Sequence, residues 1–153
     1  MFRKFTLGSI CIAALAAATV AYAQKADFGT AAEAKAMLEK AVAAVKADKA
    51  KALAMFNAGE GGFKDRDLYP FCANAGDGVI NAGPASVMGK KVQDLKDTTG
   101  KAFGEEMMKV AADGKIGEVA YMFPRPGADK TPAAKVSFVT KAGDQMCGVG
   151  YYK

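Results

Sequence analysis

The sequence predicts an α+β fold in which a long N-terminal helix packs on a five-stranded sheet. After residue 30, an alanine-rich segment repeats its apolar residues at helical spacing. Residues 63–82 contain two short runs separated by turn residues, which is typical of a hairpin. The last third of the chain contains three runs rich in Val, Phe, Tyr and Thr, which favour strands. We therefore expect the sheet to be the centre of the fold.

The N-terminal helix is expected to begin after Thr30, which forms a capping-box signature with Glu33 three residues later. The apolar residues that follow recur at intervals of three and four, as on the face of a helix that covers a sheet. They are Met37, Leu38, Ala41, Val42 and Val45. A second, shorter helix is expected over residues 49–56, before Gly59.

The middle of the chain alternates turn signals with short regular elements. We expect a strand within residues 63–74, a second at residues 79–82, a loop from residue 84 to 103, and a short helix that starts at Glu105 and closes at Gly114. Before the first strand lie Asp65, Arg66 and Asp67. These residues lack the glycine and the closing glutamate of a calcium loop, so they predict a salt-bridged turn.

The last three strands are expected at residues 117–126, 135–141 and 145–152, with a tight turn between the last two. Side chains alternate between the two faces of a strand. Lys135 and Ser137 therefore share one face, while Val136 and Phe138 occupy the other. We expect a functional site on the face that carries the charge.

The first 23 residues have the features of a secretory signal peptide. Arg3 and Lys4 precede an apolar run, and small residues, Ala21 and Ala23, stand before the expected cleavage site. Cleavage after Ala23 would leave residues 24–153 as a single domain in the periplasm or outside the cell, with no membrane span. An uncleaved membrane anchor is the alternative.

The inventory of reactive residues argues against an enzyme. The chain has no histidine, and it contains no CxxC, CxxCH, GxSxG or P-loop motif. Its formal net charge is +5, but the lysines are scattered and do not form the basic stripe of a nucleic-acid-binding protein. We expect no catalytic residue, no metal, no cofactor and no nucleic-acid partner.

Short motifs run in order along nearly all of the expected mature chain. They are Phe63-x-Asp65-x-Asp67-Leu68-Tyr69-x-Phe71-Cys72, Asp77-Gly78, Gly89-Lys90, Asp94-Leu95-x-Asp97, Gly100-Lys101, Gly114-x-Ile116-Gly117-x-Val119-x-Tyr121, Lys135-x-Ser137-Phe138-Val139 and Cys147-Gly148-Val149-Gly150-Tyr151-Tyr152. In this order and spacing they resemble the single Cache domain family of extracytoplasmic sensor modules. The resemblance implies a PAS-like, five-stranded antiparallel sheet with helices on one side. On the other side it implies a pocket for a small molecule, commonly a short carboxylate or an amino acid.

Seven pocket residues follow from the resemblance. They are Tyr69, Phe71, Tyr121, Phe123, Arg125, Lys135 and Ser137. For the aromatic residues the alternative is a place in the core, and for Arg125 it is an exposed loop. Lys135 could instead reach solvent or pair with Asp65 or Asp67. Many members of the family have a His-Pro pair where this chain has Gly83-Pro84, so we do not expect that histidine contact here.

The resemblance also bears on the cysteines. Cys72 and Cys147 are the only cysteines left after cleavage, and the PAS-like strand order makes the first and last strands neighbours. We expect a disulfide between them in an oxidising compartment, and two free buried thiols are the alternative.

Such sensor domains usually precede a membrane helix and a signalling module, whereas this sequence ends at Lys153. We expect a stand-alone ligand-binding protein that presents its ligand to a partner such as a membrane sensor protein. An interaction module that keeps the fold without binding a ligand is the alternative.

The signal-peptide hypothesis predicts that protein recovered from the periplasm begins at Gln24, because cleavage follows Ala23. Intact-mass spectrometry of the periplasmic and membrane fractions checks this. Full-length chain held in the membrane fraction would show that the segment is an anchor.

Overall fold

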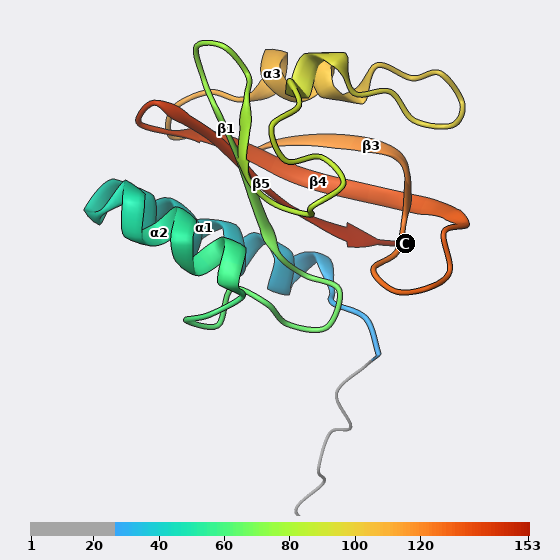
Figure 1. The fold of residues 1–153 in the computed structure, drawn as a ribbon, viewed down its shortest axis with the longest axis horizontal. Coiled ribbons are helices and arrows are strands. Elements are labelled where there is room, and N and C mark those ends of the chain that lie inside the picture. The colour runs from blue at the N-terminus through green and yellow to red at the C-terminus, as the bar shows by residue number, and fades with distance from the viewer. Residues whose placement is uncertain (1–26) are drawn as a thin grey trace, which may run out of the picture.

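The computed structural model describes residues 27–153, so the predicted signal peptide lies outside the described residues. The helical elements are α1 (Ala31–Ala47), α2 (Lys49–Ala58), the 3₁₀ turn η1 (Val92–Asp94) and α3 (Phe103–Val110). The strands are β1 (Pro70–Asn74), β2 (Ile80–Ala82), β3 (Gly117–Pro124), β4 (Pro132–Ala142) and β5 (Gln145–Tyr152). Helices α1 and α2 lie on one side of the sheet and α3 lies on the other (Figure 1).

The strands form one antiparallel sheet in the order β2-β1-β5-β4-β3. The predicted α+β fold, with N-terminal helices on a five-stranded antiparallel sheet, is therefore confirmed. The first and last strands of the chain, β1 and β5, are neighbours in the interior of the sheet. This arrangement brings residues that are far apart in the sequence onto one surface.

The helix ends follow the predicted signals. The Thr30 hydroxyl accepts a hydrogen bond from the backbone N–H of Glu33 at 3.2 Å, and the Glu33 carboxylate accepts one from the N–H of Thr30 at 2.8 Å. Asp48 caps the start of α2 by accepting from the N–H of Lys51 at 3.0 Å. Gly59 ends α2 in the left-handed conformation, with φ 70°, which glycine adopts without steric cost.

Several element boundaries differ from the prediction, and those in the middle of the chain have clear causes. β1 begins only at Pro70, because Asp65 and Leu68 exchange two backbone hydrogen bonds and close a turn before the strand. The segment expected to be a loop contains η1, and α3 begins at Phe103, two residues earlier than expected. This helix also ends at Val110, before Gly114, because residues 112 and 115 form a β-bridge.

Alternation along the strands divides the core into two clusters. One cluster, between the sheet and the N-terminal helices, includes Leu38, Phe56, Phe138 and Val149. The other, between the sheet and α3, includes Val92, Phe103, Met107, Tyr121 and Val139. Lys135 and Ser137 lie on this second side, beneath η1 and α3, and both are buried.

The register of β1 with β5 places Cys72 directly opposite Cys147, and the two residues form a disulfide with an S–S distance of 2.07 Å. The predicted pairing is confirmed. Both residues are fully buried beneath the N-terminal helices. The disulfide therefore fixes the central strand pair at a point that solvent does not reach.

Reduction of this disulfide should destabilise the domain. It closes a loop with a sequence separation of 75 residues, and the chain-entropy model assigns such a loop roughly 4 kcal/mol. Urea unfolding with and without a strong reductant measures the difference. The double variant Cys72→Ala/Cys147→Ala is the control, because its free energy of unfolding should not respond to reductant; an equal response in both proteins would contradict the expectation.

Candidate functional site

The side of the sheet beneath α3 contains a buried ammonium group, that of Lys135. The residue is only 2% exposed and lies in β4, opposite Tyr121 of β3 and Tyr152 of β5. Its Nζ atom lies 4.7 Å from the ring centroids of Tyr69 and Tyr152 and 5.1 Å from that of Phe123. Three aromatic rings therefore surround the cation.

The Lys135 ammonium uses one of its three donors within the described chain, in a 3.1 Å hydrogen bond to the Tyr69 hydroxyl. No carboxylate of residues 27–153 forms an ion pair with it. Burial lowers the pKa of Lys135 to about 7, although the nearby negative charge of Asp67 acts in the opposite direction. The alternatives in which Lys135 reaches solvent or pairs directly with Asp65 or Asp67 are therefore wrong.

Gly150 leaves the space that the Lys135 side chain fills. It lies on β5 directly opposite Ser137. A Cβ atom at this position would overlap Lys135 Cε and Ser137 Oγ. A Cβ atom at Gly148, two residues earlier on the same face, would overlap the ring of Phe71. The Gly-x-Gly sequence of β5 is thus required by the side chains that cross its face.

Tyr121 and Ser137 form a buried pair beside Lys135, with 2.9 Å between their hydroxyl oxygens. The Tyr121 ring stacks on Phe103 of α3, with ring centroids 4.2 Å apart and an interplanar angle of 9°. Burial raises the pKa of Tyr121 and that of Tyr69. Both phenols therefore stay protonated at neutral pH, and their hydroxyl groups can donate hydrogen bonds.

Five of the seven predicted residues line one cavity of about 40 Å³, which we call the inner cavity. They are Tyr69, Phe71, Tyr121, Phe123 and Lys135. Ser137 reaches this group through Tyr121. The residues that close the cavity from the other side were not predicted, and they come from the segment expected to be a loop and from α3. They include Val87, Val92, Leu95, Phe103 and Met107.

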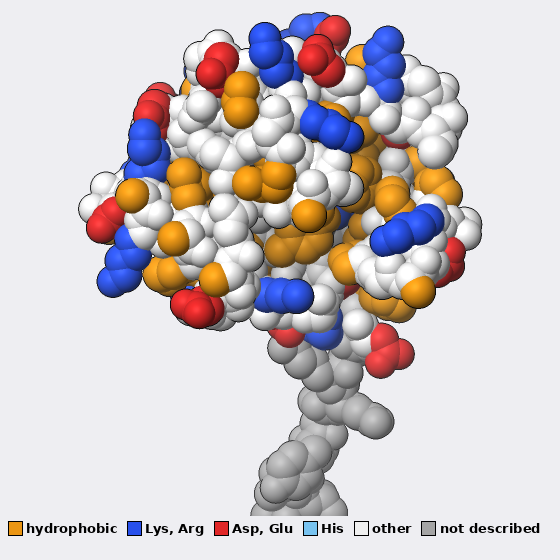
Figure 2. Space-filling view, viewed as in Figure 1, with side chains coloured by type: hydrophobic (Ala, Val, Ile, Leu, Met, Phe, Trp, Pro, Cys, Tyr) orange, Lys and Arg blue, Asp and Glu red, His pale blue; other side chains and the backbone are white. Residues whose placement is uncertain are grey.

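A larger space of about 280 Å³, the outer cavity, shares Tyr69, Pro84 and Phe123 with the inner one. Figure 2 shows a hollow near the middle of this face, with hydrophobic side chains in it and Lys or Arg side chains around it. Among the described residues that line the outer cavity, four are basic and none is acidic. The basic residues are Lys64, Arg66, Arg125 and Lys130.

Arg125, the seventh predicted residue, lines the outer cavity. Its guanidinium carbon lies 4.1 Å from the ring centroid of Phe28 and 4.9 Å from that of Tyr152. Its Nε atom is buried without a hydrogen-bond partner in the described chain, and its only hydrogen bond there is a long one, 3.5 Å, to the carbonyl of Lys153. The side chain is half-buried, so it is not the exposed loop residue of the alternative.

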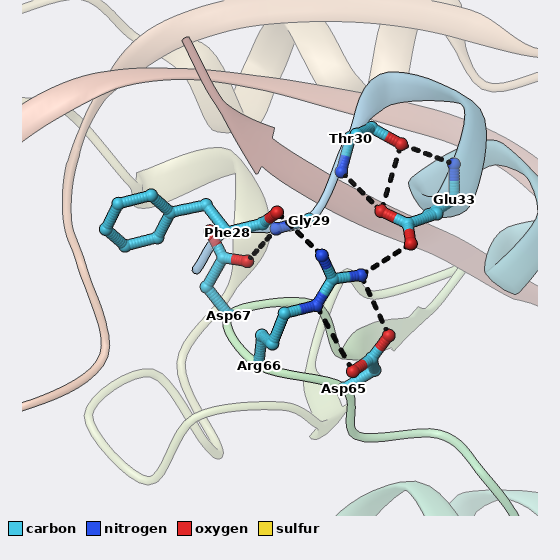
Figure 3. Close-up of polar contacts among 7 residues, drawn as sticks. All are labelled: Phe28, Gly29, Thr30, Glu33, Asp65, Arg66 and Asp67. Atoms are coloured by element: carbon cyan, nitrogen blue, oxygen red, sulfur yellow. Dashed lines mark hydrogen bonds and ion pairs between the residues drawn. The ribbon is translucent and has the colours of Figure 1, made fainter. Parts of the chain in front are cut away.

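Polar contacts hold the segment before α1 against residues 65–67 (Figure 3). Of these residues, Arg66 lines the outer cavity. The Arg66 guanidinium contacts carboxylate oxygens of Glu33 at 2.6 Å and Asp65 at 3.0 Å, and it donates to the carbonyl of Phe28 at 2.7 Å. The backbone N–H of Gly29 donates to Asp67 Oδ1 at 2.6 Å. The predicted salt-bridged turn is confirmed. Sequence reasoning missed that it holds Phe28 against Arg125, because nothing local links these residues.

Comparison with protein families decides the relationship. Residues 3–151 match the family described as Cache domain. The chain belongs to the Cache domain family. Cache sensory domains are non-catalytic binding modules, which agrees with the absence of catalytic motifs in the sequence. No curated protein matches this Cache domain in sequence.

Solved structures show the same fold. A methyl-accepting chemotaxis protein from Vibrio parahaemolyticus has 23% identity and a TM-score of 0.63, with 79% of this chain and 86% of that chain covered. A periplasmic sensor domain of a chemotaxis protein has 22% identity and a TM-score of 0.59, with 77% and 86% covered. A Cache chemosensory domain described in terms of carboxylic acid recognition has 22% identity and a TM-score of 0.58, with 77% and 84% covered.

Within residues 27–153, none of the helices combines the length and the apolar composition that a membrane span requires. The disulfide is typical of proteins in oxidising compartments outside the cytoplasm. The disulfide agrees with the similarity of this chain to a periplasmic sensor domain.

The environment of Lys135 predicts how stability depends on pH. The pKa of Lys135 is about 7 in the folded chain and 10.5, its ordinary value, in the unfolded chain. Between these pH values the unfolded chain therefore binds more protons than the folded chain does. The free energy of unfolding should therefore rise by about 2 kcal/mol from pH 7 to pH 9. In Lys135→Met this rise should disappear, whereas Lys115→Met, which removes an exposed lysine, should keep it. Chemical unfolding at several pH values measures the effect, and identical profiles for wild type and Lys135→Met would refute it.

Proposed function

We propose that this Cache domain is a periplasmic sensor module that binds a small organic anion, a short carboxylate or an amino acid, in the inner cavity. The observation that carries the proposal is the buried ammonium of Lys135, which faces a cavity and has no ion-pair partner in the described chain. In this proposal Lys135 is the charge partner of the ligand, and Tyr121 and Ser137 supply hydroxyl donors.

Burying a charge without a partner is unfavourable, and the lowered pKa of Lys135 expresses this cost. A carboxylate in the inner cavity would accept charge-assisted hydrogen bonds from the two remaining donors of the ammonium. It would also stabilise the protonated form of Lys135. The ligand therefore supplies the interaction that the folded chain leaves open.

The size of the inner cavity supports a small head group. Its volume of about 40 Å³ is little more than the roughly 30 Å³ that one water molecule occupies in the liquid, so only the head group of a ligand would fit there. The aromatic walls formed by Tyr69, Phe71 and Phe123 would exclude water from the ion pair and so strengthen it. The remainder of the ligand would extend toward the outer cavity.

The family supports the same class of ligand. One of the similar structures is described as recognising carboxylic acids, and the others are sensor domains of chemotaxis proteins. We further propose that the domain, cleaved after Ala23, presents its ligand to a membrane sensor protein.

An interaction module without a ligand is the second candidate. It is favoured by the small volume of the inner cavity and by the three rings that already surround Lys135. The two candidates differ in a simple property: only the first predicts saturable stabilisation of the folded state by a metabolite.

Binding should depend on Lys135. A thermal-shift screen of residues 24–153 with carboxylates and amino acids of two to five carbons identifies the best ligand, and calorimetry then measures its affinity. Lys135→Met should weaken binding by roughly thirty- to a hundred-fold, the equivalent of about 2 to 3 kcal/mol. Lys115→Met should bind like the wild type. Equal affinities of wild type and Lys135→Met would remove Lys135 from the site, and a screen without hits would favour the interaction module.

The same ligand should bind more weakly as the pH rises. Burial lowers the pKa of Lys135 to about 7 in the free protein, so above this pH the side chain is mostly neutral. It must then take up a proton when the carboxylate binds, and the free energy needed for this protonation reduces the observed affinity. Calorimetry at pH 6 and pH 9 should show a loss of affinity and, at pH 9, proton uptake from the buffer. Affinity that is constant over this range would contradict a charged Lys135 in the complex.

A further inference from the structure

The outer cavity contains a second cation whose hydrogen-bonding capacity is largely unused. The guanidinium of Arg125 has five N–H donors, yet its described contacts are two aromatic rings and one long hydrogen bond of 3.5 Å. Its buried Nε has no partner within residues 27–153. A buried donor without an acceptor is unfavourable, so this atom marks a place where an acceptor is missing.

Arg125 and Lys135 lie close to each other. Both cations contact the ring of Tyr152, with the Arg125 Cζ atom 4.9 Å and the Lys135 Nζ atom 4.7 Å from its centroid. The two charges are therefore no farther apart than the sum of these distances. Phe123 lines both cavities, Lys135 lines the inner one and Arg125 lines the outer one, so the two cations lie in adjoining cavities.

From these observations we infer that the ligand carries two anionic groups, one bound by Lys135 in the inner cavity and the other by Arg125 in the outer cavity. This inference rests on the proposed function, because it assigns the second end of the same ligand. Charge-assisted hydrogen bonds are about 2.8 Å long at each end. Within this upper limit, two such bonds leave at most about 4 Å between the bound anionic oxygens, a separation that a four- or five-carbon dicarboxylate can span.

The charge around the outer cavity favours a second negative group over a neutral or positive one. Four basic residues line this space, and none of the described lining residues is acidic. Arg66 is already engaged with Glu33 and Asp65, but Arg125 forms no ion pair with an Asp or Glu side chain in the described chain. The nearby acid Asp67 is held by Gly29 and lines neither cavity. An ammonium group would therefore meet four cationic side chains and no acidic one among the described lining residues.

Geometry also distinguishes the roles of the two cations. Lys135 is almost fully buried and would bind the head group that enters first, whereas Arg125 is half-buried at the outer end. Planar guanidinium groups bind carboxylates through two parallel hydrogen bonds. Loss of Arg125 should thus remove the preference for a second carboxylate without removing affinity for a single one.

Calorimetry with matched pairs of ligands tests this inference. Succinate and glutarate are compared with butyrate and pentanoate, which have the same numbers of carbons and one carboxylate. The wild type should bind the dicarboxylates at least about tenfold more tightly. Arg125→Met should reduce this preference to less than about threefold, because the dicarboxylates should lose more affinity than the monocarboxylates. Lys135→Met should weaken both classes, and the charge-matched control Lys115→Met should weaken neither.

The outcomes separate this inference from the proposed function. If the wild type binds both classes equally, the second anionic group is refuted while anion binding at Lys135 stands. If the wild type binds neither class, the inference fails, and the proposed binding of a short carboxylate at Lys135 fails with it. A preference that persists in Arg125→Met would refute the role of Arg125. Circular dichroism of each variant verifies its fold, and the comparison of ligands on the wild type needs no variant at all.

Discussion

The structure depends on the pairing of the first strand with the last. β1 and β5 meet in the interior of the sheet, and the disulfide between Cys72 and Cys147 joins them at directly opposed positions. The register of this pair and of β5 with β4 brings Tyr69 to Lys135, 66 residues away in the sequence. Closing such a long loop costs conformational entropy. The cross-link lowers that cost by restricting the unfolded chain.

Several features that are unfavourable for folding lie in or next to the two cavities. The ammonium of Lys135 is buried, Asp67 Oδ2 and Arg125 Nε are buried without hydrogen bonds in the described chain, and Arg66 has φ 56°, a left-handed conformation. Natural proteins retain such features mainly at functional sites, where optimal stability and function conflict. The opposite side, beneath α1 and α2, is an ordinary apolar core. This contrast is an argument for function that does not depend on family membership.

Local signals were sufficient for much of the fold. The capping box at Thr30, the glycine after α2 and the alternation around Lys135 each act within a few residues, and each was read correctly. The seven candidate site residues came from the resemblance to the Cache family, and the structure places them around two adjoining cavities. The stack of Arg125 on Phe28 and the aromatic contact of Tyr152 could not be predicted, because they depend on how distant segments meet. The cover formed by η1 was missed since its residues lack a clear period.

The distribution of aromatic residues gives the protein a built-in optical reporter. The chain has no tryptophan and five tyrosines, of which Tyr69, Tyr121 and Tyr152 surround Lys135 or contact its neighbours. Phenol absorption and emission respond to hydrogen bonding and to nearby charge. Ultraviolet spectra of the unlabelled protein will therefore be dominated by the region around the two cavities, so events there can be followed without attaching a dye.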